Sequence, residues 1–256
     1  MIIPFFWMIA TSFDESAMLQ ISFPPSFWPK KASLLPYVMT FRNIAMFRYI
    51  LNSMQVTLGV IAVSITSALA AGYALSKIPF RGRNFVLLGA LATLMVPFEV
   101  TMVPTFFLFK MLNLTNSYLA FYLPAVNYVF GTFFAKQYFD TIPSSFRESA
   151  LIDGANDLLI CVRIYVPLCG ALAATLVVLQ FLGVWNDFLW PLIILNSPAK
   201  YTVQVGVAMF TWDRGMQQMP AIRMASSCIV IIPVLILYLF LQRYIVESIA
   251  LSGIKQ

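Results

Sequence analysis

The chain has 256 residues, of which 61% are hydrophobic and 10% are charged, and its net charge is +6. Soluble domains carry about 25% charged residues, and a mean hydropathy of +0.85 is far higher than such a domain needs, so the composition excludes an ordinary soluble protein. The basic residues are scattered between apolar segments, which favours membrane-flanking anchors over a nucleic-acid-binding face.

The apolar segments are long enough to form membrane-spanning helices. A helix needs about 20 apolar residues to cross the roughly 30 Å hydrocarbon core, and the stretch between Arg48 and Lys77 carries no charge at all. We predict an all-α polytopic membrane protein whose residues 1–256 form a single transmembrane domain. Its full crossings are expected near 51–75, 85–109, 118–138, 168–188 and 224–241.

Residues 1–13 form a sixth apolar stretch, too short to span the bilayer by itself. It has no basic segment and no small-residue cleavage site, which argues against a signal peptide. We interpret it as part of a first helix whose beginning is missing from this chain, so that six transmembrane helices are expected. The proline-rich residues 12–49 that follow predict an extramembrane loop with a short surface helix.

The second predicted span carries a narrow stripe of small residues at every fourth position: Ser64, Ala68, Gly72 and Ser76. Such stripes mark close helix–helix contacts in lipid, either within this chain or with a second membrane subunit. Residues 77–83, which follow, hold three basic residues and no acid, and this density predicts a cytoplasmic position.

The third predicted span is interrupted by Pro97 and Pro104, with Glu99 between them. An ionisable residue inside the membrane is a functional hypothesis by default, because burying it is costly. Glu99 is therefore a candidate for a transport pathway or gate, and a wet position near the outer surface is the equal alternative.

Residues 141–167 form a polar insert between the fourth and fifth spans. Ser145 and Glu148 have the spacing of a capping box, and Pro143 suits a first helical turn, so a helix should begin there. Gly154 permits a left-handed turn, after which a second helix is predicted up to Pro167. A helix–turn–helix of this kind favours docking of a soluble partner over a solvated connector, since connectors are usually only a few residues long.

The fifth span ends in a group of aromatic and polar residues. Trp185 and Trp190 flank Asn186 and Asp187, and aromatic faces beside amide and carboxylate groups suit sugar rings and hydroxyls. The alternative is an interfacial aromatic belt with an exposed acid. Residues 196–223 are then expected to form a second polar loop.

Enzymatic chemistry finds little support in the residue inventory. The chain has no histidine, which removes the usual general base and the commonest metal ligand. Cys161, Cys169 and Cys228 show neither a disulfide framework nor metal-ligand spacing, and no G-x-x-x-x-G-K-[ST] loop is present to cradle phosphates. We predict no catalytic residue, no metal and no cofactor.

The motifs resemble those of the maltose-type carbohydrate permeases, the membrane subunits of type I ABC importers. The resemblance covers nearly the whole chain and rests on Asn52-Ser53, Tyr73 to Lys77, Phe80 to Arg83, Pro97 and Pro104, Tyr138 to Pro143, Glu148 to Pro167, Trp185 to Phe188 with Pro191, and Gln242 to Tyr244. Ser149 and Val166 are mild departures from the residues common in that family.

The resemblance implies a function as well as a fold. Glu148, Ala150, Asp153, Gly154 and Pro167 would belong to a cytoplasmic coupling loop that enters a groove on an ATP-hydrolysing subunit. Expected partners are a second homologous permease in a heterodimer, two cytoplasmic ATP-binding subunits that hold ATP and magnesium, an extracytoplasmic solute-binding protein and a carbohydrate. The expected location is a bacterial or archaeal plasma (inner) membrane.

Two other classes of protein are alternatives. A secondary active transporter of a small polar solute would predict inverted repeats with broken helices in matching positions, and neither is visible. An intramembrane enzyme would need paired carboxylates or metal-ligand spacing within the spans, which the sequence lacks.

Overall fold

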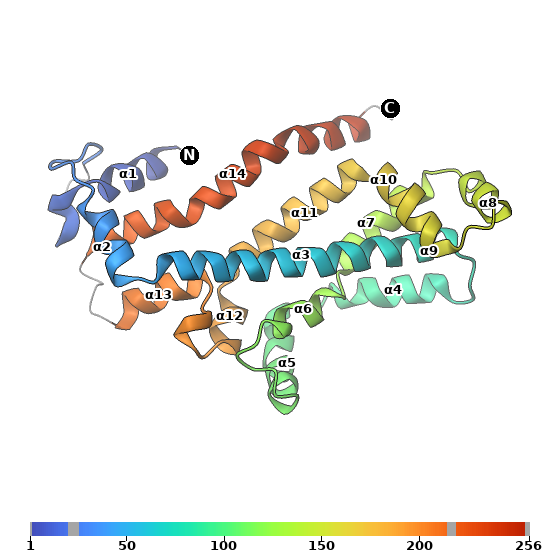
Figure 1. Ribbon diagram of the computed structural model, residues 1–256, viewed down its shortest axis with the longest axis horizontal. Coiled ribbons are helices and arrows are strands. Elements are labelled where there is room, and N and C mark those ends of the chain that lie inside the picture. The colour runs from blue at the N-terminus through green and yellow to red at the C-terminus, as the bar shows by residue number, and fades with distance from the viewer. Residues whose placement is uncertain (1, 20–25, 214–218, 254–256) are drawn as a thin grey trace. The chain divides into compact units, whose positions relative to one another are not determined.

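The computed structural model describes residues 2–19, 26–213 and 219–253, and across these residues the ordered elements are helices, with one isolated bridge between Asp14 and Ala32 (Figure 1). The longer helices are α1 (Ile3–Ser12), α2 (Leu35–Asn43), α3 (Met46–Lys77), α4 (Arg83–Thr93), α5 (Phe98–Met111), α6 (Leu119–Ala125), α7 (Val129–Asp140), α8 (Ser145–Ile152), α11 (Gly170–Trp185), α13 (Val203–Asp213) and α14 (Pro220–Gly253). The shorter elements are η1 (Glu15–Met18), α9 (Asp157–Ile160), η2 (Cys161–Tyr165), α10 (Val166–Leu168), α12 (Leu189–Ile194) and η3 (Pro198–Lys200). The predicted all-α class is confirmed.

Within the described residues, α3 and residues 220–240 of α14 are long and apolar enough to cross a membrane unaided. The number rises to four if each of two bent helix pairs counts as one span: α4 with α5, bent by 98°, and residues 157–168 with α11, bent by 84°. The chain divides into two compact units, one of residues 1–55 with 185–239 and the other of residues 56–184 with 240–256.

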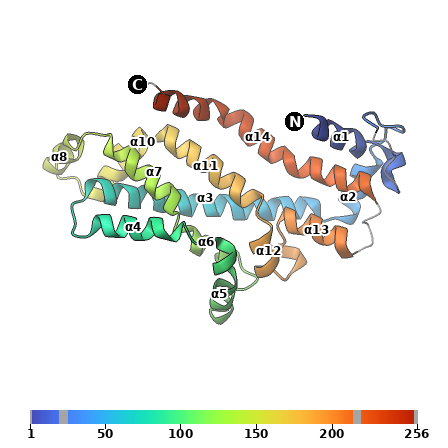
Figure 2. The ribbon, with the colours of Figure 1, turned by 180° about the vertical axis from the view of Figure 1, so that it is seen from behind.

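The small-residue stripe of α3 packs on α7 within this chain. Ser64 and Ala68 are fully buried. A Cβ placed on Gly72 would lie 2.5 Å from the Cβ of Ala135 and 2.8 Å from a backbone nitrogen of α7, and Ser76 donates a hydrogen bond to Asp140. Of the two interpretations of the stripe, contact inside the chain is therefore the one that the structure shows. Figure 2 shows α4 running beside α7 in the same unit.

Replacing Gly72 by alanine should destabilise this helix pair, even though Gly→Ala in a helix normally stabilises by about 1 kcal/mol. The added methyl group would meet backbone that cannot yield, and overpacking of this kind costs about 1–3 kcal/mol. The matched control is Gly89→Ala in α4, where the new Cβ has nothing within 4 Å. Thermal unfolding in detergent should show a lower Tm for the Gly72 variant alone, and equal Tm values would contradict this packing.

Several predicted spans are interrupted. The third is divided at residues 94–97 by Pro97, whereas Pro104 lies inside α5 without ending it. The fourth is two helices rather than one continuous helix, because Tyr128 leaves helical geometry at φ −84° and ψ 74°. Its ring fills the space that a side chain at Gly131 would occupy.

The described part of the predicted second polar loop, residues 196–213 and 219–223, is not a simple loop, because it contains α13; residues 214–218 lie outside the described residues. The first turn of α13 is buried through Val203 and Val205, and Ser53 accepts a hydrogen bond from the backbone nitrogen of Val203. Asn52 donates to the carbonyl oxygens of Ala199 and Tyr201. The Asn-Ser pair at the start of α3 thus caps α13 and holds the segment before it, which local composition could not reveal.

Candidate functional site

The polar insert forms the predicted helix–turn–helix, which we call the polar loop (residues 141–167). Helix α8 begins at Ser145, and the following helical segment runs from α9 through η2, which is π-helical, into α10. The capping box is not formed: the N-cap residue is Ser144, and its side chain makes no capping hydrogen bond. Pro143 precedes the helix instead of occupying its first turn.

Hydrogen bonds cap both helices at the turn that joins them. Gly154 has φ +83°, as predicted, and its backbone nitrogen donates to the carbonyl of Leu151 while that of Ala155 donates to the carbonyl of Ala150. This is the Schellman pattern that satisfies the last carbonyls of a helix. On the far side, Asn156 Oδ1 accepts from the backbone nitrogen of Leu159 at 2.8 Å, which caps α9.

Three side chains join the polar loop to α3. Arg147 of α8 binds Asp157 of α9 through two nitrogens, with Nε to Oδ1 at 2.7 Å and Nη2 to Oδ2 at 3.0 Å. The hydroxyl of Tyr73 in α3 donates to the same Oδ1 at 2.8 Å. We call this group the Arg147–Asp157–Tyr73 clamp. The hydrogen bonds from Arg147 hold the pKa of Asp157 below its ordinary value, so the carboxylate remains charged at neutral pH.

An apolar cluster lies beneath the clamp. The rings of Tyr73 and Tyr165 meet edge to face at 5.1 Å, and those of Phe139 and Tyr165 do so at 5.6 Å. Lys77 lies over the ring of Tyr165 and donates to the carbonyl of Ile142. The bidentate charge-assisted hydrogen bonds and the aromatic packing together hold the loop rigidly against α3.

The candidate coupling residues divide between the two faces of the loop. Ala150 is 9% exposed and belongs to the apolar cluster. Glu148, Asp153 and Gly154 are exposed. Pro167 lies inside α10 rather than at the start of the fifth span, and the chain bends after it at Cys169.

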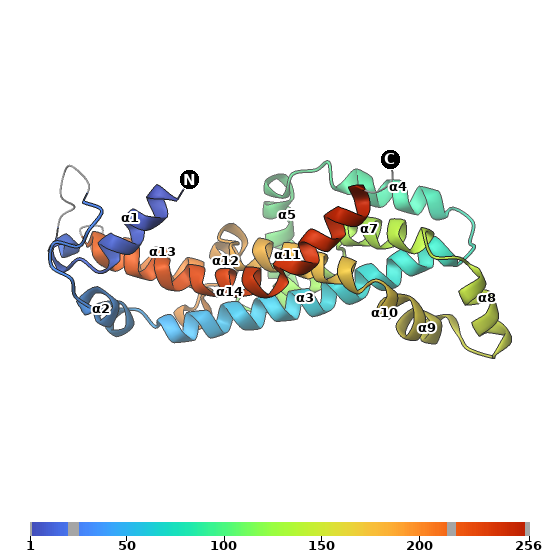
Figure 3. The same ribbon diagram turned by 90° about the horizontal axis from the view of Figure 1, so that it is seen from above.

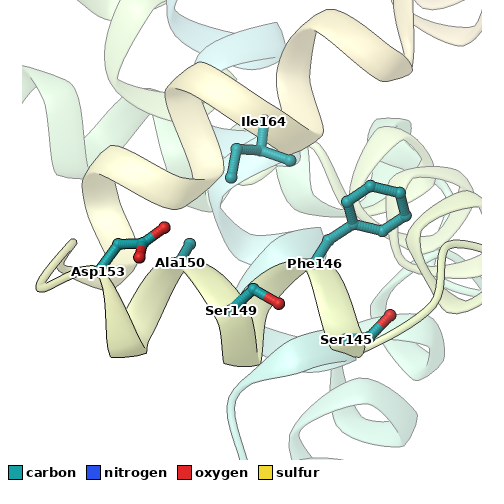
Figure 4. Close-up of a pocket in the computed structure, with 6 residues that line it drawn as sticks. All are labelled: Ser145, Phe146, Ser149, Ala150, Asp153 and Ile164. Atoms are coloured by element: carbon teal, nitrogen blue, oxygen red, sulfur yellow. The ribbon is translucent and has the colours of Figure 1, made fainter.

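A shallow cavity of about 360 Å³ lies along α8. Figure 4 shows Phe146 and Ala150 pointing from α8 toward Ile164 on the facing helical segment. The lining residues are Ser145, Phe146, Ser149, Ala150, Asp153 and Ile164. The outward face also carries large apolar side chains, since Ile152 is 87% and Leu158 is 72% exposed. An exposed apolar surface of this kind marks an interaction site.

The four candidate pathway residues lie in different environments. Trp185 is buried and its ring nitrogen donates to the carbonyl of Val230, which makes it a packing anchor. Asp187 accepts from the backbone nitrogen of Trp190 at the start of α12. Glu99 is exposed in the first turn of α5. Asn186 lines a cavity.

That cavity has a volume of about 400 Å³ and is mostly apolar, with three neutral polar side chains among its lining residues. They are Asn186, Gln204 of α13 and Ser227 of α14. We call it the amide cavity. Gln204 and Ser227 were missed from the sequence, where the only available signal was a polar residue within an otherwise apolar helix.

The fold defines a polytopic α-helical membrane protein, and the polar loop is a helix–turn–helix bonded to α3. The chain belongs to the family of binding-protein-dependent transport system inner membrane components, which it matches over residues 61–250. It is therefore a multi-pass component of a transport system.

Similar proteins agree with this membership. The arabinooligosaccharides transport system permease protein AraQ of Halalkalibacterium halodurans is 33% identical over 99% of this chain and 91% of its own length. The inner membrane ABC transporter permease protein YcjP of Escherichia coli is 32% identical over 98% and 90%. A chain in the crystal structure of a bacterial ABC transporter involved in the import of the acidic polysaccharide alginate matches with a TM-score of 0.84 at 24% identity, over 95% of this chain and 90% of that one. The expected fold of an ABC importer permease is thus confirmed.

Proposed function

We propose that this chain is the permease subunit of an ATP-driven importer that carries a sugar or related carbohydrate into a bacterial or archaeal cell. It would work with a second homologous permease, two cytoplasmic ATP-binding subunits and an extracytoplasmic solute-binding protein. ATP and magnesium would be bound by the ATP-binding subunits, so that this chain needs no cofactor and catalyses no reaction itself.

The single observation that carries the proposal is the construction of the polar loop. It is capped at its turn, ion-paired across its two helices and bonded to α3, while its outer face exposes Glu148, Asp153 and large apolar side chains. A rigid extramembrane knob with an exposed apolar face suits a soluble partner, and one that is clamped to a long helix can transmit the partner's movement to it. The names of the relatives support an ATP-driven system of this kind.

The amide cavity supports the carbohydrate part of the proposal. Binding sites are mostly apolar with a few convergent polar groups, and about 300–1,000 Å³ in volume. Amides and hydroxyls can both donate and accept hydrogen bonds, which matches the hydroxyl groups of a neutral sugar. Asn186 therefore remains the preferred candidate for a residue of the transport pathway, and Gln204 is a second candidate.

The test is copurification followed by reconstitution. The purified protein should bring a soluble ATPase, a second permease and a solute-binding protein, and one sugar of a panel should stimulate ATP hydrolysis in the presence of that binding protein. Uptake that depends on an ion gradient and not on ATP would instead establish the secondary transporter.

Replacing Asn186 or Gln204 by leucine should raise the KM for uptake by about five- to tenfold, because each loses hydrogen bonds worth about 1–1.5 kcal/mol. The number of ATP molecules hydrolysed per sugar should stay the same, since the polar loop is untouched. Asn196→Leu is the matched control, because Asn196 is exposed and outside the cavity. An unchanged KM in both cavity variants would remove the amide cavity from the pathway.

A further inference from the structure

Helix α2 buries the hydroxyl group of Thr40 and exposes a stripe of apolar side chains. Thr40 is fully buried and its hydroxyl donates to the carbonyl of Pro36 at 2.8 Å. The hydroxyl of Tyr37 forms a hydrogen bond with Ser12 at the end of α1, also at 2.8 Å. The outward stripe consists of Leu34, Val38 and Phe41, which are 65%, 46% and 54% exposed.

This arrangement is the reverse of an amphipathic helix on a soluble domain. Residues four and then three apart lie on one side of a helix, so the three exposed side chains form one continuous stripe. The hydroxyl groups of Thr40 and Tyr37 are hydrogen-bonded within the protein. The apolar stripe is therefore the surface of α2 that remains to be covered.

The stripe lies close in the chain to a helix that is long enough to span the membrane. Only Ile44 and Ala45 separate α2 from α3, which is long enough to cross the bilayer. The first turns of α3 expose Phe47 and Leu51 by 70% and 52%. Exposed apolar side chains therefore occur both on α2 and on the first turns of the spanning helix that follows it. Figure 3 shows α2 at the N-terminal end of α3.

The charges around α2 are mostly basic, and the acids are already engaged. Asp14 is buried and accepts hydrogen bonds from the backbone nitrogens of Ser16, Lys30 and Lys31. Glu15 pairs with the ammonium of Lys31 at 2.6 Å. Among the described residues near α2, the exposed cations outside this ion pair are Lys30, Arg42 and Arg48. This excess suits phosphate groups, and basic amphipathic helices bind anionic lipid surfaces for this reason.

We propose that α2 lies in the interfacial layer of the bilayer, with Leu34, Val38 and Phe41 among the acyl chains and Arg42 among the phosphates. Trp28, whose side chain is 75% exposed in the preceding loop, serves as an aromatic anchor at the same depth. The occupant of the stripe is lipid and not protein, because three side chains on a helix of nine residues fall far short of the roughly 800 Å² per partner of a stable protein interface. The helix thereby fixes the depth of α3, whatever solute the complex carries.

The test uses nitroxide labels on Val38→Cys and Phe41→Cys in the intact complex, reconstituted into nanodiscs. Collision with oxygen, which dissolves in lipid, is compared with collision with a water-soluble nickel chelate. Leu51→Cys on α3 is the lipid-facing control, and Ala199→Cys in the exposed η3 is the aqueous control. The parent chain, treated with the same nitroxide reagent, supplies the background signal from the native thiols of Cys161, Cys169 and Cys228.

Labels 38 and 41 should show an oxygen-to-nickel ratio close to that of label 51 and several-fold higher than that of label 199. Exclusion of both reagents would mean that a protein covers the stripe, and strong collision with nickel would mean water. Either result overturns the proposal. Arg42→Glu should move both labels toward water in discs that contain phosphatidylglycerol and less so in phosphatidylcholine alone, and an equal effect in both lipids would refute an attraction of Arg42 to anionic lipid.

Discussion

Valine in place of Gly154 should abolish uptake while the spanning helices stay folded. Gly154 has φ +83°, a region that L-residues rarely adopt and that is a genuine outlier for β-branched residues. The cost is conformational and not steric crowding, because a Cβ there has nothing within 4 Å. Opening the turn would misplace α8 relative to α9 and so destroy the shape of the knob that we propose docks on the ATPase.

The readouts are uptake by proteoliposomes, stimulated ATP hydrolysis and thermal unfolding of the complex. Gly154→Asn should keep most of the uptake, because asparagine tolerates left-handed geometry. Gly82→Val is the matched control, with φ +87° and similarly open space outside the polar loop, and it should retain more uptake. Normal transport by the valine variant, or equal loss in the asparagine variant, would show that the turn geometry is unimportant.

Breaking the Arg147–Asp157–Tyr73 clamp should uncouple ATP hydrolysis from uptake. Arg147→Ala removes two charge-assisted hydrogen bonds, each worth about 1.5–3 kcal/mol, and leaves Asp157 with Tyr73 alone. Asp157→Ala should have a similar effect, whereas Tyr73→Phe removes one hydrogen bond and should be milder. We expect more ATP hydrolysed per sugar transported, because movement of α8 is then no longer passed through Asp157 to α3.

A double-mutant cycle makes this prediction quantitative. If Arg147 and Asp157 act through each other, the double alanine variant should be little worse than either single one. Lys136→Ala is the control: Lys136 pairs with Asp140 four residues away on α7, and such exposed pairs contribute little. Additive losses for Arg147 and Asp157, or equal uncoupling by Lys136→Ala, would contradict a role for the clamp in coupling.

Local rules predicted the features that depend on short stretches of chain. The left-handed turn at Gly154 follows from the conformational freedom of glycine, and the break before α5 follows from Pro97. Local rules were less successful at the start of α8, where the expected capping box at Ser145 and Glu148 is not formed. Helix α13 was not predicted, because a few polar residues give an apolar, packed segment the composition of a loop.

The candidate site was predicted in outline and not in its assignments. Asn186 was identified from its neighbours, but Trp185, selected together with it, is a buried anchor. Ala150, a candidate coupling residue, packs in the apolar cluster beneath the loop and also lines the cavity along α8. Which side of a helix faces inward depends on the helices around it, and no single segment contains that information.

The sequence by itself determined the class of this protein, its apolar helices and the helix–turn–helix of its polar loop, because transfer into lipid and backbone preference are nearly local properties that sum along the chain. Only the tertiary structure decided that Arg147, Asp157 and Tyr73 meet, that the small-residue stripe packs on α7, and that α2 turns its apolar side outward. Those outcomes depend on contacts between residues far apart in the chain. Such contacts are set by close packing, in which each side chain must fit the space that its neighbours leave free.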